Sequence, residues 1–396
     1  MSFILVINCG SSSLKFSIID PSSGEAEIQG LAERLSSPDA RLKTKFSGGT
    51  SHEIPLPNAG HIEVLDEILH EMGGLKIVGV GHRVVHGGEA FKDSVRIDAD
   101  VIQGIEDCRE LAPLHNPANL IGIQAAMQKF PEVPHVAVFD TAFHQTMPPR
   151  AYLYAIPYGL YEQYKARRYG FHGTSHHFVA EEAARLLGRP IGELHLITAH
   201  LGNGCSACSV REGHSCDTTM GLTPLEGLVM GTRSGDVDPN LHDFLSRRLD
   251  NDLAGVTNIL NRESGLLGLS GLSNDMRTLV QAVSEGNARA GLAVEVFCYR
   301  LAKAILGLSA ALDRIDALVF TGGIGENSSP VRARTLGNLR VLGAKLDEAL
   351  NEQHGKSAAG RITSQDSGLL ALVVPTNEEL VIARETARFL TSTPVH

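Results

Sequence analysis

The sequence predicts an α/β protein built from two related halves, and three observations support this prediction. Residues 3–20 and 194–210 share one plan: an apolar strand, a turn of small residues and a returning strand, with Asn8 and Asn203 at the two turns. Strand and helix patterns alternate through both halves, which is typical of an α/β fold with a largely covered sheet. The length of 396 residues exceeds what one hydrophobic core usually organises, so two domains are expected.

The repeated turn is the most informative local feature. A single Gly/Ser-rich turn is ordinary hairpin chemistry. Small residues, however, also let backbone N–H groups approach phosphate oxygens, and the returning strand fixes the turn. Two such turns in one chain therefore suggest a nucleotide held between the two halves.

Composition argues against several other classes of protein. A net charge of −10 with only isolated basic doublets is unfavourable for a nucleic-acid surface. No run approaches the roughly 18 to 20 apolar residues of a membrane helix, and the first apolar stretch is interrupted at Asn8, as in a strand rather than a signal peptide. The six cysteines form no disulfide framework, and Cys205 and Cys208 are interpreted as small core residues rather than a zinc or redox pair. We expect a cytoplasmic protein.

The first half contains alternating helix and strand signals. Apolar residues at helical spacing over 62–72 predict a helix, and the strand at 76–80 leads into the motif GHRVVHGG. A helix with proline at its start is expected over about 117–130, and a buried strand over 135–140. The doublet Pro148-Pro149 then breaks the pattern, so the domain boundary is expected near residue 148.

The second half continues the alternation. In chain order it predicts a helix capped by Thr174 or Ser175, helical pattern over 241–260, a flexible loop over 264–275, a long helix over 276–312, a buried strand ending in glycines within 317–328, a last strand over 370–375 and a final helix with a Thr/Asn cap. The glycine-rich strand end opens onto a helix N-terminus and is a third place suited to a nucleotide.

Eight motifs, in order, resemble those of the acetate kinase family from Phe3 to about Arg388. They are LVINCGSSSLKF, GHRVVHGG, FDTAFHQTMP, RRYGFHGTSH, AHLGNGCSA, TPLEGLVMGTRSGD, FTGGIGENS and VPTNEELVIA. The resemblance, like the two phosphate-binding turns, implies a duplicated actin-like (ribonuclease H-like) fold with its active site in the interdomain cleft. It implies an N-terminal domain of residues 1–148, completed by a C-terminal helix at about 379–396, and a nucleotide-binding domain of residues 149–378.

Four residues are candidates for catalysis. Phosphoryl transfer spreads negative charge over three oxygens, and Arg83 at a strand end and Arg233 in a Gly-flanked loop offer fixed cations for it. An arbitrary arginine is more often a surface or ion-paired residue. The resemblance implies that both arginines contact the transferring group, that Arg83 also holds the substrate carboxylate, and that His172 stabilises the transition state. It also places Asp140, a carboxylate at the end of a buried strand, in the active site beside an arginine or the metal shell.

The histidines also allow a metal-site interpretation. His172 and His176 have the spacing of a helical metal pair, but no glutamate stands between them and no third ligand is nearby, so a zinc hydrolase is disfavoured. The resemblance leaves His176, His115 and His200 as supporting or nucleotide-side residues. For each of these three, a purely structural role remains open.

The resemblance also implies a metal, a nucleotide and an acyl site. Mg²⁺, with Mn²⁺ as an alternative ion, would be held by Asn8 and Glu378, an oxygen set that suits it, although spacing alone does not separate Glu378 from Glu379. Contacts to ATP or ADP would come from His200, Leu201, Gly202, Asn203, Gly204, Asp275, Met276, Arg277, Gly323, Ile324, Gly325, Glu326 and Asn327, and from Lys15 unless it is simply solvated. A small apolar pocket would be formed by Val85, Leu114, Phe171 and Pro224, residue types that elsewhere usually fill cores.

The expected function is reversible, Mg²⁺-assisted, direct in-line transfer of the γ-phosphoryl group of ATP to acetate, giving acetyl phosphate and ADP. A carboxylate is already ionised at neutral pH, so no general base is needed. A propionate kinase is the alternative in the same class. An actin-like ATPase switch and a sugar kinase with Asp140 as base are further alternatives. A homodimer is expected from the family alone.

Overall fold

The structure, a computed structural model, describes residues 2–113 and 115–391 and divides into two compact units. The first unit takes in the chain up to Phe143 and again from Asn377, and the second runs from His144 to Thr376. The chain therefore leaves the first unit after Phe143, five residues before the first proline of the Pro148-Pro149 doublet. Among the described residues, no helix is long and apolar enough to span a membrane.

The first unit is built on an eight-stranded sheet in the order β5-β4-β3-β2-β1-β6-β8-β7. Its strands are β1 (Phe3–Cys9), β2 (Ser13–Ile19), β3 (Ala26–Glu33), β4 (Arg41–Phe46), β5 (Ser51–Pro55), β6 (Ile77–Val84), β7 (Val95–Arg96) and β8 (His135–Phe139). β1 pairs antiparallel with β2 and parallel with β6, and β6 pairs parallel with β8. The carboxyl ends of β1, β6 and β8 consequently lie at one edge of the sheet.

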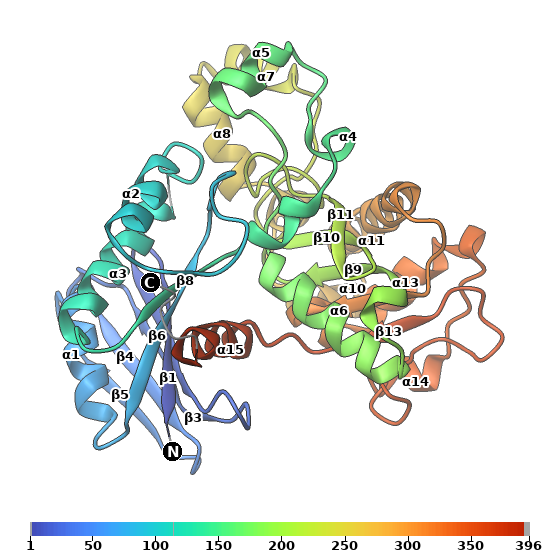
Figure 1. The fold of residues 1–396 in the computed structure, drawn as a ribbon. Helices are drawn as coiled ribbons and strands as arrows, with labels where there is room; N and C mark the ends of the chain where they lie inside the picture. The colour runs from blue at the N-terminus through green and yellow to red at the C-terminus, as the bar shows by residue number, and fades with distance from the viewer. Residues whose placement is uncertain (1, 114, 392–396) are drawn as a thin grey trace. The chain divides into compact units, whose positions relative to one another are not determined.

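Helices cover both faces of this sheet (Figure 1). They are α1 (His61–Glu71), α2 (Ala99–Asp107), α3 (Asn116–Lys129) and α15 (Glu378–Thr391), and a 3-10 turn spans Ala142–Thr146. Val80 packs in the core that α1 and α3 cover, whereas its neighbour Gly81 faces α15. A Cβ on Gly81 would lie 2.4 Å from Thr386 Oγ1 and 2.6 Å from Ile382 Cγ2. Glycine is thus required for the close approach of α15 to β6.

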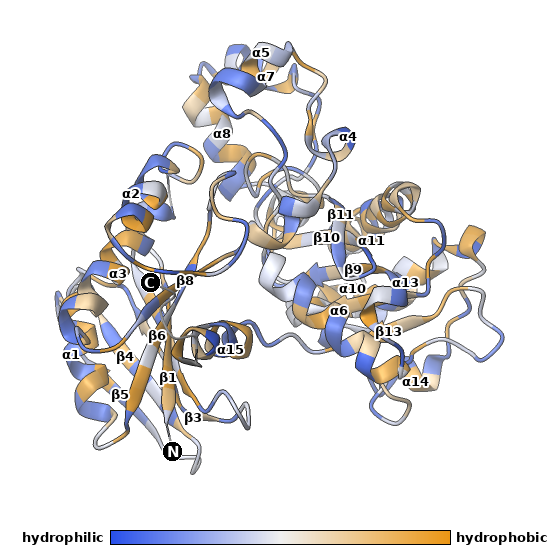
Figure 2. Ribbon diagram, viewed as in Figure 1, coloured by the Kyte–Doolittle hydropathy of each residue, from blue (hydrophilic) through white to orange (hydrophobic). Residues whose placement is uncertain are grey.

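The second unit contains a five-stranded sheet in the order β11-β10-β9-β12-β13. Its strands are β9 (His195–Leu201), β10 (Cys205–Arg211), β11 (His214–Thr218), β12 (Ala317–Thr321) and β13 (Ala371–Val373). β9 pairs antiparallel with β10 and parallel with β12, so the arrangement β10-β9-β12 repeats β2-β1-β6 of the first unit. In Figure 2 β1, at the centre of the first sheet, is largely hydrophobic in colour, as expected for a strand covered on both faces.

The helices of the second unit lie between and around these strands. They are α4 (Pro149–Tyr152), α5 (Tyr158–Tyr164), α6 (Gly173–Leu187), α7 (Leu241–Leu249), α8 (Leu253–Arg262), α9 (Gly265–Ser270), α10 (Met276–Ser284), α11 (Ala288–Leu308), α12 (Gly322–Asn327), α13 (Ser329–Gly337) and α14 (Glu348–Glu352). Short 3-10 turns cover Ile191–Glu193, Ser309–Ala311 and Arg340–Leu342.

Three local predictions for this unit were wrong. The helix predicted to be capped by Thr174 or Ser175 begins at Gly173, because His172 takes a left-handed backbone conformation and occupies the N-cap. The loop predicted over 264–275 contains α9, where burial of Leu266 overrides the low helix propensity of glycine and serine.

The third error concerns the single helix predicted over 276–312. The structure has two helices there, α10 and α11. Gly286 follows α10 with a φ of +86°, and the side chain of Asn287 caps α11 by accepting a hydrogen bond from the N–H of Ala290 at 3.0 Å. Likewise, the helical pattern over 241–260 is divided into α7 and α8, which begins after the capping residue Asp252.

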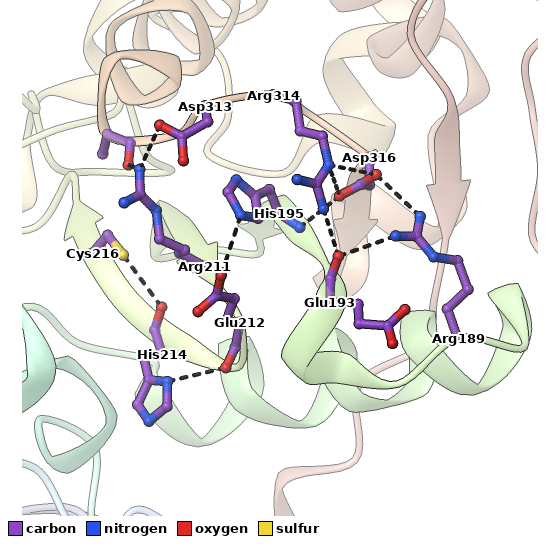
Figure 3. Close-up of polar contacts among 11 residues, drawn as sticks. Arg189, Glu193, His195, Arg211, Glu212, His214, Cys216, Asp313, Arg314 and Asp316 are labelled. Carbon is purple, nitrogen blue, oxygen red and sulfur yellow. Dashed lines mark hydrogen bonds and ion pairs between the residues drawn. The ribbon is translucent and has the colours of Figure 1, made fainter.

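A polar cluster fixes the beginnings of β9 and β12 (Figure 3). Asp316, just before β12, accepts hydrogen bonds from the N–H of His195 at 2.8 Å and from the side chains of Arg189 at 3.1 Å and Arg314 at 3.0 Å. Burial opposes the charge of Asp316, but these bonds outweigh it and lower the pKa of the carboxyl group. The cluster stabilises the edge of the sheet at the amino end of β9, whereas His200 lies near the carboxyl end of the same strand.

Candidate active site

In the first unit, Arg83 and Asp140 form an ion pair at the carboxyl edge of the sheet. Arg83 is the penultimate residue of β6, and Asp140 follows β8 directly. Arg83 Nε lies 3.0 Å from Asp140 Oδ1 and Arg83 Nη2 lies 2.5 Å from Oδ2, which is a bidentate arrangement. Burial opposes the charge of Arg83, but Asp140 and then Glu378 outweigh it, so the pKa of the guanidinium is raised. Arg83 is thereby fixed as a permanent cation.

Two further oxygen donors lie around Arg83. Asn8 Oδ1, at the end of β1, is 3.4 Å from Arg83 Nη1, and Glu378 Oε2, at the start of α15, is 4.0 Å from Arg83 Nε. With Asp140 these groups make an all-oxygen set of the kind that hard divalent cations prefer. The donor chemistry near Arg83 therefore fits Mg²⁺ or Mn²⁺.

Glu379 points elsewhere, although it is next to Glu378 in sequence. Its carboxylate accepts a hydrogen bond from Ser17 and pairs with Lys15 Nζ at 2.5 Å. The Lys15 side chain, 58% exposed, is thus held by a carboxylate in this structure. The contacts in the structure thus distinguish Glu378, which lies near Arg83, from Glu379, which sequence spacing did not.

The loop after β6 carries Val85, one of the residues predicted for the acyl pocket. Val85 is 8% exposed, and its backbone N–H donates to Asn119 Oδ1 at 3.1 Å. The next N–H, that of His86, donates to Asn116 Oδ1 at 3.2 Å. These two buried amides of α3 escaped the sequence prediction, although polar residues at an i, i+3 spacing on an otherwise apolar helix were a usable signal. His115 is the N-cap of α3, and Leu114 lies outside the described residues.

In the second unit, His172 and Arg233 converge on Gly204. A Cβ on Gly204 would lie 3.4 Å from the His172 ring and 3.5 Å from Arg233 Nη1. His172 has φ 57° and ψ 24°, a conformation that costs a non-glycine residue energy and is often found at functional sites. Its ring stacks on that of His200 with centroids 4.3 Å apart. The side chains of His172 and Arg233 therefore both lie beside the turn of small residues between β9 and β10.

Arg233 differs from Arg83 in its partners. Arg233 Nη1 donates to the carbonyl of Pro224 at 3.1 Å, and no carboxylate among the described residues lies within ion-pair distance. Burial lowers the pKa of this guanidinium. An anion entering this site would therefore be attracted by a cation without a competing carboxylate. Pro224 is held beside Arg233 by this bond, and Phe171, 2% exposed, precedes His172 in the chain.

A cavity of about 1000 Å³ lies beside the same turn. It is lined by Gly202, Asn203, Asn274, Asp275, Met276, Arg277, Val280, Gln281, Ser284, Gly323, Ile324, Asn327, Ser328 and Pro330. Eight of these residues belong to the predicted nucleotide set, and they come from three segments distant in sequence. A cavity of this size exceeds what a small ligand needs and has the dimensions of a nucleotide site. Sequence reasoning missed one face of α10, the residues Val280, Gln281 and Ser284, which follow Met276 and Arg277 at helical spacing.

Other predicted nucleotide residues support the cavity without lining it. Leu201 is fully buried in β9. Gly325 packs closely, because a Cβ there would lie 3.4 Å from the backbone of Phe320. Glu326 Oε1 accepts hydrogen bonds from the N–H groups of Gly322 at 3.0 Å and Thr376 at 3.1 Å. These residues fix the backbone of the glycine-rich strand end.

Comparison with known proteins identifies the family. The acetokinase family profile matches residues 3–384. The chain belongs to the acetokinase family. An acetate kinase of Deinococcus radiodurans is 55% identical over 387 residues, covering 97% of each chain, and an acetate kinase of Stutzerimonas stutzeri is 55% identical over 390 residues, covering 98% of each.

Solved structures agree with this assignment. A propionate kinase from Francisella tularensis superposes with a TM-score of 0.93 at 46% identity, covering 98% of this chain and all of the other. An acetate kinase from Porphyromonas gingivalis gives a TM-score of 0.92 at 40% identity, covering 99% of this chain and all of the other. The predicted duplicated actin-like fold is confirmed.

Proposed function

We propose that this protein transfers the γ-phosphoryl group of ATP to acetate, reversibly and without a covalent enzyme intermediate. The observation that carries the proposal is the pair of fixed cations. Arg83 is anchored by Asp140 in one unit, while Arg233 and His172 flank the turn beside the nucleotide-sized cavity in the other. Phosphoryl transfer depends on positioning and on electrostatic stabilisation of charge, which such groups supply.

Each group has a specific role in this proposal. The cavity holds the nucleoside, and the N–H groups of the turn at 202–204 bind its phosphates. Arg83 binds the carboxylate of the acceptor, which attacks directly because it is already ionised. Arg233 and His172 stabilise the transferring group, and Val85, Phe171 and Pro224 surround the methyl group of the acceptor. Closure of the protein during turnover excludes water and so suppresses hydrolysis of ATP.

A divalent cation, Mg²⁺ or Mn²⁺, is part of the proposal. Asn8 and Glu378 would hold it, supported by the oxygen-only character of these donors. When bound, the ion neutralises phosphate charge. Chelation with EDTA is expected to abolish activity, and re-addition of Mg²⁺ to restore it.

The experiment measures ADP formation from Mg-ATP with acetate, propionate, butyrate, glycerol or no acceptor, and traps acyl phosphate with hydroxylamine. Acetate-dependent hydroxamate is expected, with a loss of about 100-fold or more in Arg83→Ala. Arg41→Ala is a matched control, because Arg41 also pairs with a carboxylate in the first unit, Glu33 at 3.3 Å, but its side chain is 36% exposed at the start of β4. ATP turnover without acceptor or hydroxamate would instead identify an ATPase.

A propionate kinase is the second candidate, favoured by the 46% identity to the Francisella tularensis enzyme. One additional methylene changes discrimination by only about 1 to 3 kcal/mol, so both acids are expected to react at different rates. The ratio of kcat/KM for acetate and propionate in the same assay decides between the two.

Two further properties are proposed. A homodimer follows from the family resemblance alone, and light scattering after size exclusion should then give twice the chain mass of 42.4 kDa. A cytoplasmic location is supported by the six cysteines, all of which are free thiols. Cell fractionation tests it.

A further inference from the structure

The side chain of His172 leads into a buried chain of hydrogen bonds within the second unit. His172 Nδ1 lies 2.9 Å from Ser206 Oγ, and the same oxygen lies 2.7 Å from His176 Nε2. On the other side of its ring, His176 Nδ1 lies 2.7 Å from Thr198 Oγ1. Ser206, His176 and Thr198 have no exposed surface. Because water does not reach these groups, their protons have to be shared within the chain.

The distances assign a direction to these bonds. Burial, and then His144 and His200, lower the pKa of His176 well below its usual range, so its ring is neutral and has one N–H. The hydroxyl of Thr198 has two acceptors in reach, His176 Nδ1 at 2.7 Å and the carbonyl oxygen of Cys208 at 3.5 Å. Hydrogen bonds between oxygen donors and their acceptors are usually below 3.0 Å, so Thr198 donates to His176.

The remaining protons follow from that first donation. With Nδ1 accepting, His176 carries its proton on Nε2 and donates it to Ser206. Ser206 then has only its own hydroxyl proton left, and it donates this proton to His172 Nδ1. A neutral His172 whose Nδ1 accepts a hydrogen bond must carry its proton on Nε2.

We propose that Thr198, His176 and Ser206 are positioning residues that hold neutral His172 with its proton on Nε2. The inference deepens the proposed function and rests on it, since Nε2 is the nitrogen beside Gly204, where His172 and Arg233 converge. A proton at this atom lets His172 donate to a phosphoryl oxygen without first becoming charged.

The surroundings of His172 in this unit agree with a neutral ring. Arg233 is a cation near the same point, His200 stacks on the ring, and His176 lies behind it through Ser206. A nearby positive charge disfavours a second one. A neutral ring keeps its Nε2 proton as the pH rises, so this hydrogen-bond donation does not require a protonated imidazolium.

The first test is spectroscopic and needs neither ATP nor acetate. Protein labelled with ¹⁵N-histidine is examined by long-range ¹H–¹⁵N NMR at a pH where His172 is neutral, and its signals are assigned by their loss in His172→Gln. The wild type should carry the proton on Nε2, and Ser206→Ala should populate both tautomers. Ser209→Ala is the matched control, because Ser209 is a buried serine of the same strand that donates to the carbonyl of Leu308 at 2.7 Å. It should leave the spectrum unchanged.

The second test is kinetic. Ser206→Ala should lower kcat about 10-fold, with a larger loss at alkaline pH and with KM for ATP changed less than about 2-fold, because orientation of a donor and not binding is lost. Ser209→Ala should stay within about 2-fold of the wild type.

A proton on Nδ1 in the neutral wild type would overturn the proposal, even if Ser206→Ala does not fold. Equal spectra and rates for the two serine variants would overturn it as well. Failure of the kinase assay alone, with the Nε2 proton observed, would count against the proposed function instead.

Discussion

Replacing Arg83 alone should destabilise the first unit more than replacing both members of its ion pair. Asp140 is 1% exposed, so Arg83→Met leaves a buried carboxylate without the guanidinium of Arg83, at a cost of about 3 to 5 kcal/mol. Asp140→Asn should cost less, about 1 to 3 kcal/mol, because Arg83 keeps Glu378 at 4.0 Å and is itself 21% exposed. The double variant should resemble Asp140→Asn, since it contains no buried carboxylate that has lost the guanidinium of Arg83.

Urea unfolding followed by far-UV circular dichroism measures this difference. With a urea dependence of about 2 kcal/mol per M, a loss of 4 kcal/mol moves the midpoint by about 2 M. The chain has no tryptophan, and all seven tyrosines lie within residues 152–299 of the second unit, so tyrosine fluorescence is an internal control that reports the other unit.

The pH dependence has a defined sign. In Arg83→Met, protonation of Asp140 removes the buried negative charge. The folded state therefore holds that proton more tightly than the unfolded state does. The stability deficit should therefore shrink as the pH falls. The reasoning is refuted if the double variant is as unstable as Arg83→Met, because the cost would then come from lost packing and not from the buried carboxylate that has lost Arg83.

The remaining predictions concern other parts of the molecule. Gly204→Ala places a methyl group 3.4 Å from His172 without a clash, so the melting temperature should hold while calorimetry shows weaker ATP binding. Gly81→Val would force α15 away from β6 and should lower the unfolding free energy by about 1 to 3 kcal/mol or more, as seen in urea. Asp316→Asn should destabilise the second unit by about 1 to 3 kcal/mol at neutral pH. Because the pKa of Asp316 is lowered in the folded state, that difference should begin to shrink below about pH 4 and should be lost as the pH falls through the lowered pKa, as measured by thermal unfolding.

Features encoded within one short segment were predictable. The turns at Asn8 and Asn203 and their flanking strands follow from local patterns, and the two-unit α/β fold that they indicated is confirmed. The separation of α10 from α11 could also have been found, since a glycine followed by a capping asparagine is an end and a start signal. The hydrophobic pattern continues on both sides of Gly286, and for this reason a single helix was predicted.

Features that depend on distant segments were not predictable from pattern. Asp140 meets Arg83 because β6 and β8 are parallel neighbours, and only the family resemblance placed both residues in one site. Thr198 and Ser206 lie among ordinary small residues of two strands, and their connection to His172 arises when α6 packs near β9 and β10. Neither composition nor spacing identifies such residues, because their hydroxyl groups find hydrogen-bonding partners only in the folded unit.

The return of the chain to the first unit at Asn377 sets an order for events on the ribosome. When residue 143 has been synthesised, the surface of β6 at Gly81 still lacks α15, whose residues come more than 230 positions later. At roughly 5 to 20 residues per second this interval lasts on the order of 10 to 50 s. The second unit, which is continuous in sequence and ends at Thr376, is synthesised during that time. During this interval the sheet of the first unit lacks the helix that covers β6 at Gly81. We therefore expect chaperones or proteases to engage a nascent chain that stalls before α15 is made.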